Sequence, residues 1–180
     1  MEKYEIFRKE LEHKGVIVDF YSNYVKIPNG NVAKWDHIEH KGAACIIPVT
    51  DNGDILLVRQ YRGSADREFL EIPAGGLNPG EDMLTCARRE LEEETGYRSE
   101  NISYLMEIFT SPAYCSERLE IYCATHLIPT EQNLDEDEFL EVEKIPLEKA
   151  KKMVEQGKIP DAKTQILILR VLTLLRDKKI

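Results

Sequence analysis

The alternation of apolar and polar residues predicts β-strands over much of the chain. In the first 40 residues, the runs GVIVDFYSNYVKI and NVAKWDHIEH alternate on either side of Asn29-Gly30, a dipeptide typical of tight hairpin turns. Two apolar runs, GAACIIPVT and ILLVRQYR, flank a second such turn at Asn52-Gly53. REFLEIPAGG predicts a further strand that ends at Pro73, and SYLMEIFTSP and ERLEIYCATHLI predict two more. NLDEDEFLEVEKI is expected to be an acidic loop that enters a last strand.

Other segments have the spacing and the end signals of helices. The first is predicted over about 82–95 and is ended by Gly96. PLEKAKKMVEQG predicts a helix with Pro146 near its start and Gly157 after its end. DAKTQILILRVLTLLRDKK predicts a last amphipathic helix with Asp161 as its cap. Because no βαβ unit repeats, the order predicts an α/β sandwich around a mixed sheet rather than a Rossmann fold.

Composition and charge exclude some classes of function. A chain of 180 residues suits one domain with a small appendage. Its net charge of -9 argues against a general nucleic-acid binder. It does not exclude a phosphate-bearing substrate, because a bound divalent cation can make the local charge positive. The four cysteines form no CxxC pair, which favours reduced, buried thiols. Without a signal-like segment or a membrane-spanning apolar run, we expect a cytoplasmic protein that binds neither membrane nor nucleic acid.

The first helix concentrates negative charge near its C-terminal end, where the helix dipole favours cations instead. At about 100° per residue, an apolar stripe faces the core; it consists of Leu84, Ala87 and Leu91. Glu90, Glu93 and Glu94 fall on an adjoining arc. Such an arc can be a solvated face, but this one borders the apolar stripe, and Arg89 precedes Glu93 by one turn. Carboxylate oxygens at this density suit Mg²⁺ or Mn²⁺ better than zinc.

The segment GGLNPGEDMLTCARRELEEETGY fits the Nudix box in spacing, with Tyr97 as a variant at the last apolar position. The matching positions are Gly75, Glu81, Arg89, Glu90, Leu91, Glu93, Glu94 and Gly96. The chain therefore resembles the Nudix hydrolase superfamily. The resemblance implies a Nudix-like α/β/α sandwich around a mixed β-sheet, with an N-terminal antiparallel β module.

The same resemblance assigns roles to the box. It implies that Glu90 and Glu94 are the principal ligands of divalent cations that bridge a diphosphate. Glu93 would be a further ligand or would orient the catalytic groups, and the carbonyl of Ala74 would be a backbone ligand. Glu81 and Arg89 are expected to join the loop to the helix. Gly75 and Gly96 are expected to have conformational roles.

Stretches outside the box are similar to the ADP-ribose pyrophosphatases, namely VRQYR, EIPAG, TSPAYCSE and DEDEF. This similarity implies hydrolysis of ADP-ribose to AMP and ribose 5-phosphate with Mg²⁺, for which Mn²⁺ could substitute, by a homodimer. Residues 1–40 would be a β-strand module for dimerisation and the adenine site, and residues 41–180 the Nudix hydrolase domain. Ala113 stands where the subfamily usually has glycine, which puts the geometry of that loop in question.

The similarity also implies substrate-binding residues, each of which has an alternative role. Arg62 is expected to bind a phosphate through two hydrogen bonds. Arg59 faces the other side of the strand and is either a site residue or a surface charge. Glu71 is either on the substrate side or caps a loop. The remaining candidates are Glu117 for the terminal ribose or a metal, and Trp35 and Phe20 for stacking on adenine.

The catalytic base is expected on the acidic loop 135–138. We predict Glu138 first and Glu136 second, because a base on a loop could close over the substrate; a solvated acidic loop is the alternative. Rival functions are hydrolysis of another diphosphate, such as an NDP-sugar, a dinucleoside polyphosphate or an oxidised nucleotide, and non-catalytic sensing of ADP-ribose. The intact glutamates of the box disfavour the sensor.

Overall fold

The computed structural model describes residues 3–136 and 138–177, and it divides into two compact units. The first contains the described part of Met1–Ala43 together with Glu107–Glu120. The second contains Ala44–Met106 and the described part of Ile121–Ile180. Three strands each have residues in both units, namely β4 (Ala43–Pro48), β9 (Asn101–Phe109) and β10 (Arg118–Thr125).

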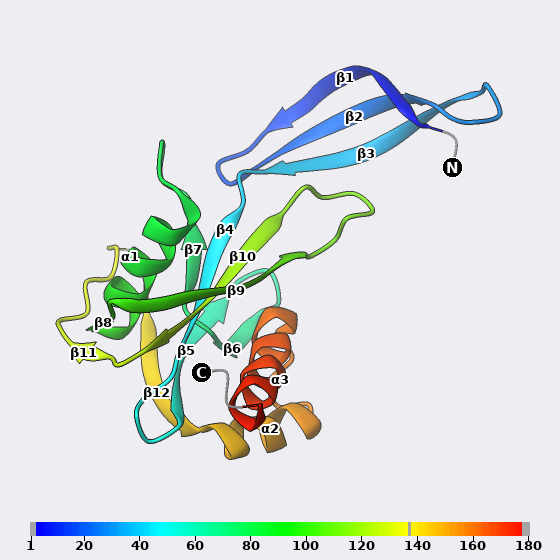
Figure 1. The fold of residues 1–180 in the computed structure, drawn as a ribbon. Helices are drawn as coiled ribbons and strands as arrows, with labels where there is room; N and C mark the ends of the chain where they lie inside the picture. Colours follow the sequence, from blue (N-terminus) through cyan, green and yellow to red (C-terminus); the bar gives the residue numbers. More distant parts are fainter. Residues whose placement is uncertain (1–2, 137, 178–180) are drawn as a thin grey trace. The chain divides into compact units, whose positions relative to one another are not determined.

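The first unit is built on an antiparallel sheet in the order β1-β2-β3 (Figure 1). Its strands are β1 (Glu5–Lys14), β2 (Val18–Lys26) and β3 (Val32–His40). The predicted Asn29-Gly30 turn joins β2 to β3, and Gly30 has the left-handed φ of 88° that such turns need. Strand β1 was not predicted from the sequence, because its charged residues interrupt the alternation, and two register shifts interrupt its pairing with β2.

The second unit holds most of the remaining strands, which form the sheets β7-β4-β10-β9 and β12-β5-β6 and the short pair β11-β8. Their bounds are β4 (Ala43–Pro48), β5 (Asp54–Arg62), β6 (Arg67–Glu71), β7 (Ala74–Gly76), β8 (Tyr97–Arg98), β11 (Ile128–Pro129) and β12 (Leu140–Pro146). The strand predicted to end at Pro73 is β6. The chain then leaves that sheet, and β7 joins the other one at its edge. Pro73, which has no N–H for a ladder, lies at this change of sheet.

The helices follow their predicted end signals. Helix α1 (Met83–Thr95) is capped by the Asp82 side chain and ends at Gly96, whose φ is 67°. Helix α2 (Leu147–Glu155) begins after Pro146, and α3 (Ala162–Arg176) begins at Asp161, which accepts a hydrogen bond from an amide of the first turn.

Within the second unit, α1 and the pair α2–α3 lie on opposite sides of the strands (Figure 1), which is the predicted α/β/α sandwich. On the α1 side, Ala87 and Leu91 pack against Ile46 of β4 and Ala124 of β10. The prediction that Leu84 belongs to this core is wrong, since its side chain is exposed. Met83 and Cys86 are buried instead, so the buried face is rotated toward the glutamates. In the described residues, no helix is long and apolar enough to cross a membrane.

Candidate active site

The last turns of α1 bury two carboxylates. Glu90 is 6% exposed and Glu94 is 2% exposed, so they lie within the buried face of the helix and not merely beside it. Both meet the short strand β7. The Ala74 N–H donates to Glu94 Oε2 at 3.0 Å. A Cβ placed on Gly75 would lie 1.9 Å from Glu90 Oε1. Gly75 does not have a left-handed φ, so its role is to leave space for Glu90 and not the conformational role expected from the sequence.

Arg89 organises the carboxylates around it. Its Nε and Nη2 donate to the two oxygens of Glu81 at 2.9 and 3.0 Å, and Nη2 also donates to the Gly76 carbonyl at 3.0 Å. Its Nη1 donates to Glu90 Oε1 at 2.6 Å and to Glu93 Oε2 at 2.9 Å. One guanidinium therefore joins the box loop to the helix, as the sequence predicted for Glu81 and Arg89, and also orients Glu93.

The electrostatics of this cluster favour a ligand of positive charge. Burial, opposed by Arg89, raises the pKa of Glu90 to about 7. Burial and the neighbouring charge of Glu90 raise the pKa of Glu94 to about 8, although the Ala74 N–H lowers it. Near neutral pH, a carboxyl group with so high a pKa is stabilised either by holding a proton or by binding a cation.

The donor set fits a hard divalent cation. Across residues 3–136 and 138–177, no three acidic, histidine or cysteine side chains converge as a complete metal site. Mg²⁺ does not need such a cage, because it is usually held by one or two carboxylates together with substrate phosphates and water. Glu90 and Glu94, with the backbone at Ala74 beside them, provide oxygens of that kind.

Arg62 and Glu71, predicted separately, form one ion pair. Arg62 Nε and Nη2 donate to Glu71 Oε1 and Oε2 at 2.9 and 2.8 Å. The charge of Arg62 is also one of the influences that lower the pKa of Glu94, so the guanidinium lies near the buried carboxylates. Glu71 binds a third residue, Lys163 of α3, at 2.5 Å. Sequence reasoning missed Lys163, although a lysine in the first turn of a helix opposes the helix dipole and was a usable signal.

Arg59 faces away from Arg62, as the alternation along β5 predicts. Its Nε donates to Glu143 Oε1 at 2.6 Å. Arg59 lines a hollow of about 550 Å³ together with Glu138, the predicted base, and the exposed Phe139. The structure thus brings two predicted site residues together on this side of the β12-β5-β6 sheet.

The acidic loop lies near the buried carboxylates. Glu138 is exposed, and its charge is among the influences that raise the pKa of Glu90 and Glu94, after burial. Glu136 is also exposed, and Asp137 lies outside the described residues.

The segment before this loop is tied to the end of α1. The Asn133 N–H donates to the Glu93 carbonyl at 3.0 Å, and Gln132 Nε2 donates to the Glu94 carbonyl at 2.7 Å. These bonds satisfy carbonyls that a helix end leaves without partners. They anchor the acidic loop on the helix that carries Glu90 and Glu94.

The remaining residues that were predicted to contact the substrate belong to the first unit. Trp35 pairs with Asn23 and Phe20 pairs with Ile38, so the two aromatic side chains lie on opposite faces of the sheet. One adenine ring therefore cannot stack on both within one module. Trp35 is 44% exposed and packs against the ring of Tyr4, with 5.6 Å between centroids.

Glu117 is held inside the first unit. Its Oε2 accepts a hydrogen bond from Thr110 Oγ1 at 2.6 Å, and its Oε1 lies 3.9 Å from His40 Nε2. In the same loop, Ala113 does not have a positive φ, so alanine occupies the position usually held by glycine without backbone strain.

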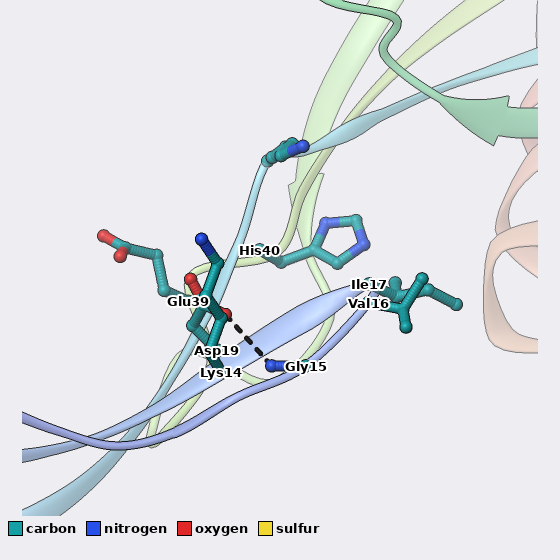
Figure 2. Close-up of a pocket in the computed structure, with 8 residues that line it drawn as sticks. Lys14, Gly15, Val16, Ile17, Asp19, Glu39 and His40 are labelled. Carbon is teal, nitrogen blue, oxygen red and sulfur yellow. Dashed lines mark hydrogen bonds between the residues drawn. The ribbon is translucent and has the colours of Figure 1, made fainter.

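A hollow of about 450 Å³ opens beside the β1–β2 turn (Figure 2). Val16 and Ile17 project from the turn, and the Gly15 N–H donates to Asp19 Oδ1 at 3.2 Å. His40 also lines this hollow, whereas the predicted adenine contacts Trp35 and Phe20 do not. It is therefore not the stacking site expected from the sequence.

Comparisons with known proteins agree with this geometry. Residues 39–164 match the NUDIX domain. The chain is 41% identical over 158 residues to the ADP-ribose pyrophosphatase of Bacillus subtilis (strain 168), covering 87% of this chain and 85% of that protein. It is 38% identical over 156 residues to the methanol dehydrogenase activator of Bacillus methanolicus, covering 86% and 84%.

A solved structure described as an ADP compounds hydrolase has the same fold. It superimposes with a TM-score of 0.87 at 24% identity, and the match covers 100% of this chain and 98% of that one. The family match spans most of the chain and includes both α1 and the strand that faces its buried carboxylates. The chain therefore belongs to the NUDIX family.

Proposed function

We propose that this protein hydrolyses the diphosphate of ADP-ribose to AMP and ribose 5-phosphate, with Mg²⁺ as its cofactor and Mn²⁺ as a possible substitute. The observation that carries the proposal is the pair of buried carboxylates, Glu90 and Glu94, against the backbone of Ala74 and Gly75. The choice of substrate is supported by the similarity to an ADP-ribose pyrophosphatase over most of the chain.

Glu90 and Glu94, with Glu93 and the carbonyl of Ala74, would hold the cation. Bound Mg²⁺ supplies neutralisation of the diphosphate charge and activation of the attacking water. Arg89 keeps its contacts with Glu81 and Glu93, and so holds the carboxylates in the direction that a ligand requires. Positioning and electrostatics then provide most of the rate enhancement, as is usual for reactions at phosphorus.

Glu138 would take the proton from the attacking water, with Glu136 as the second candidate. The loop that carries them is anchored on α1 through Gln132, which keeps the base near the cation site. Arg62 would bind a phosphate, because its side chain is 42% exposed although Glu71 holds it on one edge. Arg59 would act from the hollow that it lines with Glu138.

The first unit would bind the rest of the substrate and a second subunit. Trp35 or Phe20 would stack on adenine, and Glu117 would contact the terminal ribose or a metal. A homodimer is supported by large apolar side chains that the β1-β2-β3 sheet leaves exposed, among them Ile6, Phe7 and Leu11. Such a set of exposed apolar residues is typical of an interface.

The test is a panel of nucleoside diphosphate derivatives incubated with Mg²⁺ or Mn²⁺, with the products separated by chromatography. ADP-ribose should be turned over fastest and should yield AMP and ribose 5-phosphate. A large preference for an NDP-sugar, a dinucleoside polyphosphate or an oxidised nucleotide would reject ADP-ribose as the substrate. The absence of turnover of every member with either metal would reject the enzymatic function. Light scattering gives the mass of the particle and tests the dimer.

A further inference from the structure

A lysine that the proposed chemistry does not use lies partly buried beside the site. Lys163 is in the first turn of α3, and its side chain is 15% exposed. Its Nζ lies 2.5 Å from Glu71 Oε2 and 3.0 Å from Asp161 Oδ1. Burial acts to lower its pKa, but Asp161 and Glu71 outweigh burial and raise it, so Lys163 is charged.

The carboxylate that Lys163 binds is the one that holds Arg62. Glu71 is 3% exposed, and its Oε2 is shared, since it accepts from Arg62 Nη2 at 2.8 Å as well as from Lys163. Three residues beyond Glu71 along the chain is Ala74, whose N–H donates a hydrogen bond to Glu94. The three side chains therefore form one connected row that ends beside the buried carboxylates of α1.

The sharing of Glu71 determines how much charge Arg62 can offer to a substrate. Arg62 and Lys163 together balance Glu71 and Asp161. Without Lys163, Glu71 would serve Arg62 alone, and Asp161 would lose a neighbouring positive charge. Both changes would draw the Arg62 guanidinium toward Glu71 and Asp161 and away from a phosphate of the substrate, because ion pairs in a partly buried site are weakly screened.

The docking of α3 does not depend on Lys163 alone. The Ile72 N–H donates to Thr164 Oγ1 at 2.9 Å, and Asp161 accepts from the Thr164 N–H at 2.9 Å. The first bond joins the start of α3 to the residue after β6, and the second caps the helix, both without the lysine. The ammonium of Lys163 can therefore serve a purpose other than holding the helix.

We infer that Lys163 is a positioning residue: through Glu71 it fixes the guanidinium of Arg62 and keeps it available for a phosphate of the substrate. This inference rests on the proposed function only in that the substrate is a nucleoside diphosphate derivative. It does not depend on which derivative is preferred.

Steady-state kinetics of four variants test this role, with whichever member of the panel the wild-type protein turns over fastest. Lys163→Met, which keeps the length but not the charge, should raise KM about tenfold while kcat changes by less than about twofold. Lys163→Arg should restore most of the wild-type KM. Lys158→Met, at an exposed lysine just before α3, should have the wild-type KM. Thr164→Val loses the bond to Ile72, so it should lower the melting temperature without raising KM.

A double-mutant cycle shows whether Lys163 acts through Arg62. Arg62→Met should raise KM by itself, and Lys163→Met should add little to it. Additive effects, an unchanged KM in Lys163→Met, or a Thr164→Val variant with an equally raised KM would each overturn the inference. If Lys163→Met does not fold, Lys163→Gln takes its place with the same expectations. A poor rate with ADP-ribose would count against the proposed substrate and would leave this test intact.

Discussion

Replacing Gly75 with alanine should remove most of the activity and leave the fold in place. A Cβ at this position would lie 1.9 Å from Glu90 Oε1, 2.2 Å from its Cδ and 2.5 Å from its Oε2. Ordinary van der Waals contact begins at 3.4 Å, so the nearer carboxylate oxygen must retreat by about 1.5 Å (3.4 − 1.9). That retreat also breaks its 2.6 Å hydrogen bond from Arg89.

The clash falls on the end of a flexible side chain and not on the backbone. The side chain can rotate away, and forcing one extra carbon into a packed site costs about 1–3 kcal/mol. For a protein of this size, the melting temperature should fall by roughly 2–4 °C per kcal/mol. Activity responds differently, because misplacing a group by about 1 Å can cost on the order of 100-fold in rate. The variant should thus be folded, weakly active and dependent on a higher Mg²⁺ concentration.

Gly76→Ala is the matched control. A Cβ on Gly76 would meet nothing within 4 Å, and neither glycine has a left-handed φ, so both substitutions have the same backbone cost. The assay is a Mg²⁺ titration of kcat for wild type and both variants, with the melting temperature measured in parallel. Gly76→Ala should stay within about twofold of wild type. If Gly75→Ala keeps the wild-type rate and Mg²⁺ dependence, the position of the Glu90 carboxylate does not matter and the assigned site is refuted.

Further predictions concern the same cluster. Glu94→Gln should lower kcat on the order of 100-fold or more and leave the protein folded; near wild-type turnover would contradict the metal assignment. The folded pKa values of Glu90 and Glu94, about 7 and about 8, exceed their ordinary 4.5. The contribution of these two carboxyls to the stability of the metal-free protein should therefore be greatest below this ordinary value and should be lost as pH rises through 7 and 8. Melting curves in EDTA should show this decline, and Mg²⁺ should reduce it. Arg89→Lys should cost about 2–3 kcal/mol in urea unfolding, because an ammonium cannot reproduce the forked contacts. Gln132→Met should lower kcat about fivefold by loosening the acidic loop, whereas Asn133→Ala, which keeps its backbone bond, should not.

The sequence predicted α1 well because its end signals act locally. Asp82 caps the first turn and Gly96 takes the left-handed φ, and neither depends on the rest of the fold. The same sequence misplaced Leu84, because a helical wheel assigns apolar residues to the core and charges to solvent. In the structure, β7 approaches the helix on its carboxylate side, so Glu90 and Glu94 are buried and Leu84 is not.

Neither the row of ion pairs formed by Arg62, Glu71 and Lys163 nor strand β1 could be predicted from the sequence, and the reasons differ. Glu71 and Lys163 are 92 residues apart, and only the packing of α3 against the end of β6 brings them together. Strand β1 pairs with β2 although its pattern is mostly charged. Such a strand is held by cross-strand contacts, such as Ser22 Oγ with Glu12 Oε1, that alternation does not encode.

Helices α1 and α3, which border the site, each carry at one end a charge that the helix dipole disfavours. The way in which each charge is compensated shows which helix end needs a ligand. Lys163 lies at the positive end of α3, but Glu71 and Asp161 neutralise it within the protein. Glu94 lies at the negative end of α1 and gains a hydrogen bond from Ala74, yet burial and Glu90 still raise its pKa to about 8. A charge that the fold compensates serves the structure or positions a neighbour. A buried carboxylate that the fold leaves poorly compensated is stabilised by what binds there, and the ligand that we propose for Glu90 and Glu94 is a divalent cation with its diphosphate.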